Sequence, residues 1–328
     1  MPTTIVTARP AGVADQVPAP VDDGLFGPNS VSWQLSTAPA AAVAIPAAVL
    51  MQMLHPRVMW MIDQASSFWQ YPERRAQLTQ RYGISITYGD AATAEHAGAT
   101  LRSIHEHRTA VDPISGEAYR ADEPDLLMWV HCTIPWAVLR ALARWGPRLT
   151  PAEQDQYVHE QRTAARLVGI EPDTAPGSVA ELDAHMASMR SKMALTPGCV
   201  RLLKLMMPRS PKPAPATLLQ SVFSHAALSL LTPEQRRLYG IRWTRLDELT
   251  ATTIPGVLLR KAAAKMRADE QLPKLRAEAM AHPFGGPPRP TAGVSTATPA
   301  ALPGSTPTAD DSSGVQSTRA TRSGGPRH

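Results

Sequence analysis

Cysteine is nearly absent from this 328-residue sequence, which contains only Cys132 and Cys199. The two residues lie far apart and form no CxxC pair. This spacing argues against a disulfide framework and against a structural zinc site. A protein with so little cysteine and no cysteine pattern fits a reducing compartment, so we expect a cytoplasmic location.

Long hydrophobic runs are also missing. The first residues contain no apolar run of the kind that a secretory signal needs. The longest apolar stretch, residues 38–54, is interrupted by Pro39 and Pro46 and is shorter than the ~20 residues that cross a bilayer. We therefore expect no integral membrane span, and we interpret this stretch as a helix that enters the core.

Aromatic residues make up 5% of the chain and charged residues 19%. Alanine, leucine, methionine and arginine are abundant instead, which favours helix over sheet. The formal net charge is +5, but the Lys and Arg residues are mixed with Asp and Glu rather than clustered. This distribution argues against a nucleic-acid-binding protein.

Several catalytic signatures do not occur in the sequence. It has no glycine-rich phosphate loop, no HExxH, no ExxH pair of the di-iron bundles, no GxSxG elbow and no dinucleotide-binding fingerprint. Enzymes that rely on a nucleophile elbow or on paired carboxylates are therefore disfavoured.

The sequence does contain helix-forming segments between two ends of biased composition. We expect a flexible N-terminal arm over residues 1–23, one all-α domain over residues 24–282, and a disordered tail rich in Pro, Gly, Ser and Thr over residues 283–328. No segment predicts a strand, and residues 111–122 should be a polar loop. Caps, prolines, glycines and apolar periodicity predict helices over residues 47–54, 72–82, 91–108, 124–145, 151–168, 202–207, 218–231, 233–240 and 258–276, with a further one after Ser178.

Three histidines lie in apolar helical sequence, where a histidine is either a hydrogen-bonded core residue or a ligand to a metal or cofactor. His55 precedes Pro56, so the helix should break at the histidine and free it to point inward or to cap the helix. His131 shares a helix face with apolar residues and should face the core.

His105 is the inward histidine of its helix, because His107 points in nearly the opposite direction. Ala94, Ala97 and Gly98 share the face of His105. Such small side chains either allow close helix packing or leave room for a flat ligand.

Arg75 and Thr79 lie four residues apart on one helix face. A guanidinium with a hydroxyl one turn on suits a carboxylate or a bound oxygen species, although the same pair is also common on solvated surfaces. Inward histidines with a nearby arginine are what a b-type haem pocket needs, since the iron takes an imidazole and the propionates favour arginine.

Taken in order, four motifs resemble the MpaB-type oxygenase family, which includes the rubber oxygenases called latex-clearing proteins. They are Gln52-Met-Leu-His55-Pro56, Arg75-x-x-x-Thr79, Ile104-His105 and Asp125-Leu-Leu-Met-Trp-Val-His131. The resemblance covers residues 24–275. It implies a single all-helical domain that binds haem b and uses O₂ to oxidise or cleave an unsaturated hydrophobic molecule.

Carried over by position, the resemblance makes His105 the proximal ligand of the haem iron. It makes Arg75 and Thr79 the catalytic pair beside the haem, and His55 and His131 residues of the haem pocket. Leu78 stands where many relatives have a basic residue, and Asp63 where a histidine is expected. These departures point to a small hydrophobic substrate rather than rubber.

Two alternatives remain open from the sequence. One is a non-catalytic protein that binds haem or another hydrophobic ligand in the same pocket. The other is a helical scaffold whose histidines are all core residues. The oligomeric state is not predicted by any of these patterns.

Overall fold

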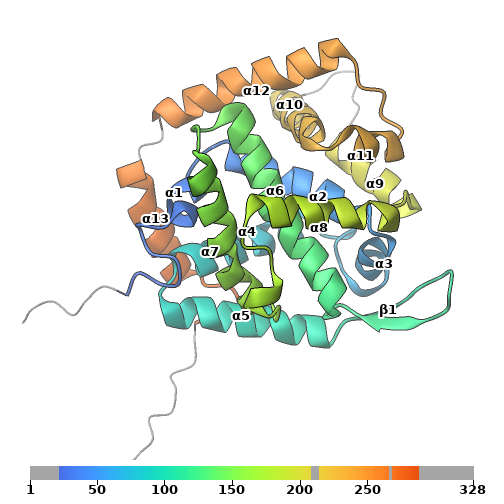
Figure 1. Cartoon of the computed structure of the whole chain (residues 1–328), viewed down its shortest axis with the longest axis horizontal. Coiled ribbons are helices and arrows are strands. Elements are labelled where there is room, and N and C mark those ends of the chain that lie inside the picture. Colours follow the sequence, from blue (N-terminus) through green and yellow to red (C-terminus); the bar gives the residue numbers. More distant parts are fainter. Residues whose placement is uncertain (1–21, 208–213, 266–267, 288–328) are drawn as a thin grey trace, which may run out of the picture. The chain divides into compact units, whose positions relative to one another are not determined.

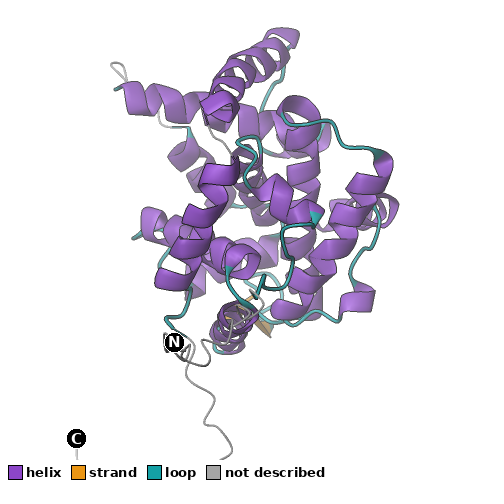
Figure 2. Ribbon diagram, turned by 90° about the vertical axis from the view of Figure 1, so that its left-hand side faces the viewer, coloured by secondary structure: helices purple, strands orange, loops and turns teal. Residues whose placement is uncertain are grey.

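The computed structural model describes residues 22–207, 214–265 and 268–287 (Figure 1). Helices dominate this part of the chain (Figure 2), which confirms the all-α prediction. In chain order, the elements are α1 (Val31–Ser36), α2 (Ala41–Met53), α3 (Pro56–Ala65), α4 (Pro72–Tyr88), α5 (Ala91–Glu106), β1 (Thr109–Val111), β2 (Ala118–Arg120), α6 (Pro124–Trp145), α7 (Pro151–Leu167), η1 (Pro172–Thr174), α8 (Val179–Ser188), η2 (Met189–Lys192), α9 (Pro197–Met206), α10 (Pro215–Leu230), α11 (Pro233–Leu238), α12 (Arg245–Lys265) and α13 (Ala268–Ala281).

The expected arm over residues 1–23 and tail over residues 283–328 lie almost wholly outside the described residues and stay predictions. One boundary needs correction. Phe284 is buried and packs edge-on against Tyr82 of α4, with ring centroids 5.4 Å apart. Packing against the domain therefore continues at least to Phe284, beyond the predicted end at residue 282.

The core is organised around α6, which runs through the middle of the helices in Figure 1 and packs along α2. Trp129 of α6 is fully buried, and its indole nitrogen donates to the carbonyl oxygen of Gln52 over 3.2 Å. The Gln52 amide in turn donates to Thr133 Oγ1 over 2.8 Å. The buried polar groups of Trp129, Gln52 and Thr133 thus have hydrogen-bond partners within the α2–α6 contact.

α6 is also the one helix in the described part of the chain that is long and apolar enough by itself to span a membrane. More than half of its most apolar window is buried inside the domain. A core helix has the same length and composition, so this finding gives only weak support for a span.

α2 ends at a sharp corner, as the His55-Pro56 dipeptide predicts. The axes of α2 and α3 differ by 98°, His55 is extended with φ −80° and ψ 114°, and Pro56 opens α3. Proline cannot donate to the preceding turn, so the helix cannot continue through it. The start of α2 differs from expectation, because Pro46 lies inside the helix rather than in its first turn.

Distant residues satisfy the carbonyl groups that this corner leaves open. Tyr239 Oη donates to Leu50 O over 2.7 Å, and Cys199 Sγ donates to Met53 O over 3.0 Å. The backbone N–H of Ala194 donates to Leu54 O over 2.8 Å. Together with Trp129, these groups cap the carboxyl end of α2.

Most predicted caps are present. Asp90 accepts from the N–H of Thr93 at the start of α5, and full capping boxes begin α7 at Thr150 and α11 at Thr232. Ser178 also caps α8, but the Glu181 carboxylate accepts from the N–H of Gly177 rather than from that of Ser178, so this helix start has no reciprocal capping box. Short local patterns of this kind depend on few distant contacts, which explains why the sequence predicts them well.

Three other expectations are wrong. Gly83 lies inside α4, which continues to Tyr88. The predicted helix over residues 258–276, which Pro273 should kink or break, corresponds to two helices, α12 and α13, and Pro273 lies within the second. The predicted loop over residues 111–122 forms part of an antiparallel hairpin in which Ala110 pairs with Tyr119. Each strand has three residues, too few for a period-2 pattern to be recognised.

Candidate functional site

His105 lies in the last turn of α5 and is half-buried. Burial, followed by the charge of Arg75, lowers its pKa, while Asp122 acts in the opposite direction. The ring is therefore neutral at physiological pH, which is the form that binds a metal. Its Nδ1 atom is buried and has no hydrogen-bond partner in the described part of the chain.

His107 points elsewhere, as its helical position predicts. It is exposed, and its Nδ1 lies 2.7 Å from the carbonyl oxygen of Ser103. Of the two neighbouring histidines, only His105 combines burial with an unpartnered ring nitrogen.

Arg75 of α4 is brought into the surroundings of His105. Its own pKa is lowered by burial and by the nearby charge of Arg108. Arg75 next to the neutral imidazole, with Arg108 next to Arg75, forms a local site for an anion such as a carboxylate.

Thr79 takes a different role from the expected one. Its side chain is exposed, and Oγ1 donates to the carbonyl oxygen of Arg75 over 3.0 Å. The hydroxyl therefore bonds to its own helix, a common habit of threonine within helices.

The small residues beside His105 serve helix packing. Ala94 and Ala97 are fully buried, and a Cβ atom on Gly98 would lie 2.9 Å from the carbonyl oxygen of Leu167 on α7. The sequence left two interpretations of this helix face, close packing or room for a flat ligand. The structure favours close packing at these three positions. Space for a flat ligand beside His105 must come from other residues.

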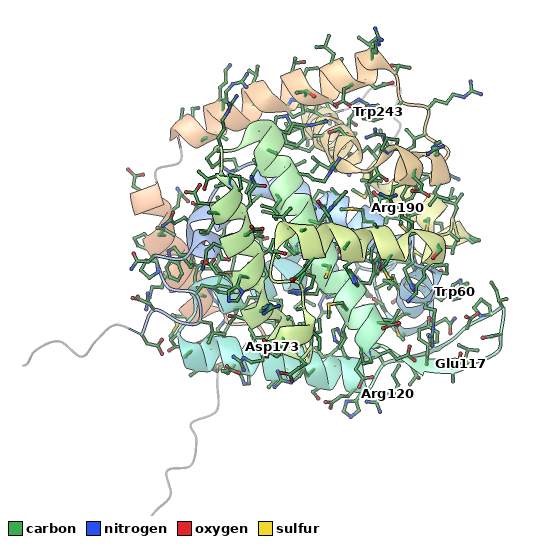
Figure 3. The ribbon with its side chains drawn as sticks, viewed as in Figure 1. Trp60, Glu117, Arg120, Asp173, Arg190 and Trp243 are labelled. Atoms are coloured by element: carbon green, nitrogen blue, oxygen red, sulfur yellow. The ribbon has the colours of Figure 1, made fainter. Side chains whose placement is uncertain are left out.

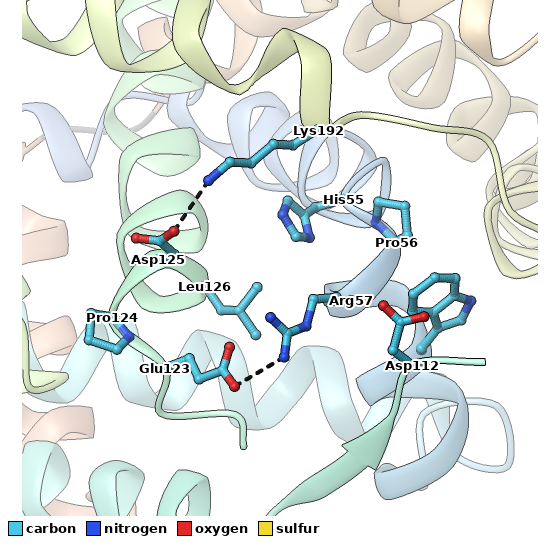
Figure 4. A pocket seen from close by; sticks show the side chains of 10 residues that line it. His55, Pro56, Arg57, Asp112, Glu123, Pro124, Asp125, Leu126 and Lys192 are labelled. Atoms are coloured by element: carbon cyan, nitrogen blue, oxygen red, sulfur yellow. Dashed lines mark hydrogen bonds and ion pairs between the residues drawn. The ribbon is translucent and has the colours of Figure 1, made fainter. Parts of the chain in front are cut away.

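His55 lies at a cavity of about 600 Å³ (Figure 4). Only 7% of the residue is exposed, and burial together with the charges of Lys192 and Arg57 lowers its pKa to about 4. Its Nδ1 atom is buried without a partner in the described residues. The cavity is lined by His55, Pro56, Arg57, Trp60, Asp112, Glu123, Pro124, Asp125, Leu126 and Lys192.

Two ion pairs join the elements around this cavity. Arg57 of α3 bonds to Glu123 over 3.1 Å, and Lys192 of η2 bonds to Asp125 of α6 over 3.2 Å. Figure 4 shows both pairs with Leu126 between them. Proline, tryptophan and leucine thus give the cavity an apolar part, and Asp112 is the one charged lining residue outside the two ion pairs. Figure 3 shows Trp60 on the same side as the hairpin tip at Glu117.

His131 of α6 lies near His185 of α8. Its pKa is lowered to about 4 by burial and by His185. His185, on α8, is itself influenced by Lys192 and Asp125. Sequence reasoning missed His185 as a candidate, although its i, i+3, i+4, i+7 relation to Leu182, Met186 and Met189 indicates an inward face.

The two groups meet at the start of α6. Asp122 acts on His105, while the next residue, Glu123, is the N-cap position of α6 and lines the His55 cavity. The structure therefore places His105 near Arg75 and His55 at a neighbouring cavity.

No group of three or more His, Cys, Asp or Glu side chains in the described residues is arranged to hold a metal ion. A metal here would need to bring further ligands with it. Iron in a porphyrin does so and requires one imidazole from the protein. The neutral, unpartnered ring of His105 beside Arg75 and Arg108 fits that requirement.

The described part of the chain is thus an all-helical domain in which a neutral histidine lies near an arginine. Residues 33–268 match the family described as ER-bound oxygenase mpaB/B'/Rubber oxygenase, catalytic domain, and the chain belongs to this family. No curated protein and no solved structure matches the sequence. Family membership confirms the resemblance and supports an oxidoreductase activity that uses O₂ and a substrate.

Proposed function

We propose that this protein is a haem-b-dependent oxygenase that uses O₂ to oxidise or cleave an unsaturated hydrophobic small molecule. The observation that carries the proposal is the His105 ring, which is half-buried, neutral and unpartnered at the family position next to Arg75. When bound, haem supplies an iron centre that binds and activates O₂. His105 would hold the iron.

Arg75 and Arg108 would bind the propionate groups of the cofactor. Arg75 acts on His105 and Arg108 acts on Arg75, and a guanidinium pairs well with a carboxylate. Thr79 supports this arrangement indirectly through its bond to the backbone of Arg75. We assign Thr79 a positioning role and Arg75 a binding role.

The His55 cavity is our proposed place for the substrate. Its volume of about 600 Å³ lies within the usual range for small-molecule sites. The part lined by proline, tryptophan and leucine suits a hydrocarbon chain. His55 is neutral at physiological pH because its pKa is about 4. Neutral imidazoles donate or accept one hydrogen bond without placing a charge next to an apolar substrate.

We also propose a cytoplasmic location, supported by the free and buried state of Cys132 and Cys199. Both thiols are shielded, and Cys199 donates its hydrogen to Met53 O. A reducing environment keeps such thiols in the form that the fold uses.

The absorption spectrum of the purified full chain tests the cofactor assignment. The wild-type protein should show a Soret band that shifts on addition of carbon monoxide. His105→Ala should lose the band, and His107→Ala should keep it, because His107 is exposed and bonded to Ser103 O. Equal haem content in the two variants would show that His105 is not the ligand.

Oxygen consumption separates the enzyme from a non-catalytic haem or hydrophobic-ligand-binding protein. The oxygenase should consume O₂ when supplied with unsaturated isoprenoid or fatty-acid probes, with or without an added reductant. A haem-loaded protein that binds these probes and consumes no O₂ would favour the binding function.

A further inference from the structure

Three arginines converge far from the candidate site, where the second half of α6 meets the end of α10. Arg140 and Arg144 lie one turn apart on α6, and Arg236 reaches the same region from α11. Burial lowers the pKa of Arg140 most, followed by the charges of Arg144 and Arg236. The three guanidinium groups are thus close enough to repel one another.

The carboxylates nearby do not match these charges one for one. Of these three arginines, only Arg144 forms an ion pair among the described residues, and its partner is Glu248. The carboxylate of Asp183 accepts from the indole nitrogen of Trp136 over 2.9 Å and forms no ion pair with the arginines in this part of the chain. Two guanidinium groups, those of Arg140 and Arg236, therefore have no carboxylate partner there.

Part of this charge caps α10. Arg236 Nη1 donates to Leu231 O over 2.7 Å and to Ser229 O over 3.2 Å, and Arg140 Nε donates to Leu230 O over 2.8 Å. Cations at the carboxyl end of a helix are favourable. Capping accounts for only some of the donors, however.

Several N–H groups remain unused. Arg236 is 9% exposed, and its Nε atom is buried with no partner in the described residues. Arg144 Nη1 is in the same condition. Both Nη groups of Arg140 also lack a protein partner there, although the side chain is held in place over the ring of Trp136 at 4.4 Å. Trp243, labelled in Figure 3, holds Arg236 in the same way at 4.7 Å.

A cavity of about 260 Å³ lies beside two of the three arginines. It is lined by Arg140, Ala143, Arg144, Ser229 and Leu230. Since a liquid water occupies about 30 Å³, the cavity has room for a phosphate-sized group with a few waters. The planar guanidinium groups of Arg140 and Arg144 lie one helical turn apart, and each can donate hydrogen bonds to the oxygen atoms of a phosphate. Arg140 and Arg144 bring two positive charges to the cavity, against the single Glu248 carboxylate that pairs with Arg144, so the net charge of these groups favours an anion.

We propose that this cavity binds a phosphate group, held by the guanidinium groups of Arg140 and Arg144. The site is separate from the candidate oxygenase site, because Arg140 lies 16 residues along α6 from Pro124, or roughly 24 Å at ~1.5 Å per residue. The phosphate belongs either to a free ion or to a lipid headgroup.

Isothermal titration calorimetry of the full chain with inorganic phosphate tests the proposal, at constant ionic strength and mildly alkaline pH. We expect saturable binding at one site per chain. Arg140→Gln should weaken it about tenfold or more, since a bond to a charged group contributes about 1.5–3 kcal/mol. Arg148→Gln is the matched control, because Arg148 is exposed just beyond α6.

A parallel sedimentation assay uses phosphatidylcholine vesicles with and without phosphatidic acid. Binding to phosphatidic acid alone, lost in Arg140→Gln and kept in Arg148→Gln, would assign the site to a lipid phosphate. Circular dichroism checks that each variant folds, and Arg140→Lys, which keeps the charge but not the fork, should bind with intermediate strength. The proposal is overturned if neither probe binds, or if Arg140→Gln and Arg148→Gln bind equally.

Discussion

The charge state of individual histidines decides what this protein can bind. His105 differs from His107 in burial and in hydrogen bonding, although the two are separated by one residue. A neutral ring offers a lone pair to a metal, whereas a protonated one does not. The environment of His105, rather than its presence in the sequence, is what makes it a candidate ligand.

Arg75 contributes to that environment, and its removal should be measurable. Because the Arg75 charge lowers the pKa of His105, Arg75→Gln should raise that pKa and bring it closer to the ordinary value of 6.5. NMR titration of the His105 ring in protein prepared without haem measures the change. Arg74→Gln is the control, since Arg74 is the exposed neighbour. An unchanged His105 pKa in Arg75→Gln would mean that the two groups are not close in solution.

At the scale of the element, two glycines within helices have opposite roles. Gly98 of α5 lies against the backbone of α7, with 2.9 Å between its would-be Cβ and Leu167 O. Gly83 of α4 has open space around the same position. The first glycine is required by packing, and the second is not.

Paired substitutions should reveal this difference. Gly98→Ala should lower the free energy of unfolding by about 1–3 kcal/mol, because the added methyl group forces α5 and α7 apart. Gly83→Ala should raise it by up to about 1 kcal/mol, because alanine has the higher helix propensity. Urea denaturation followed by circular dichroism measures both. Stabilisation by Gly98→Ala would show that α5 and α7 are not in close contact.

Helix caps show a second dependence on local sequence. The Thr150 hydroxyl accepts from the N–H of Glu153, and the Glu153 carboxylate accepts from the N–H of Thr150. Thr150→Ala should lower the free energy of unfolding by about 1 kcal/mol, whereas Thr150→Ser should change it little. Thermal denaturation compares the two variants. An equal loss in both would assign the effect to the threonine methyl group instead of the hydroxyl.

The accuracy of sequence reasoning follows from how local each signal is. The corner at His55, the caps at Asp90, Thr150 and Thr232 and the full extent of α6 were predictable, because prolines and capping residues act within a few positions. The continuation of α4 through Gly83 was not, since tertiary contacts override the preference of one glycine.

The sequence predicts which residues belong to the candidate site, and these stay predictions, but it does not predict which of them lie close together. Helical periodicity indicates that His105 faces inward, yet it contains no information on which helix lies opposite. His185 of α8 acts on His131 of α6, and this proximity depends on packing between elements far apart in the sequence. Only the folded structure shows it.

At the scale of the whole molecule, buried histidines make stability depend on pH. The pKa of His55 is about 4 in the folded state, against about 6.5 when unfolded. The unfolded state therefore binds the proton more readily, so stability is full above pH 6.5 and falls as the pH drops toward 4. His131 has the same low pKa and adds to the effect in the same direction.

Urea unfolding across this range provides the measurement. His55 alone should account for a loss of about 3 kcal/mol between pH 6.5 and pH 4. His55→Gln should show a shallower fall than the wild-type protein, whereas His107→Gln should follow the wild-type curve. A wild-type stability that stays constant over this interval would mean that the His55 ring is accessible to solvent protons at no cost.

The corner after α2 has a consequence for how the chain reaches its native state. The last carbonyl groups of this helix bond to Trp129, Ala194, Cys199 and Tyr239, all of which follow it in the sequence. During translation, α2 is synthesised long before Tyr239. The last carbonyl groups of α2 therefore lack their native hydrogen-bond partners until most of the chain has been made. Hydrophobic segments that stay exposed during synthesis are prone to aggregate, which is one reason why cells need chaperones.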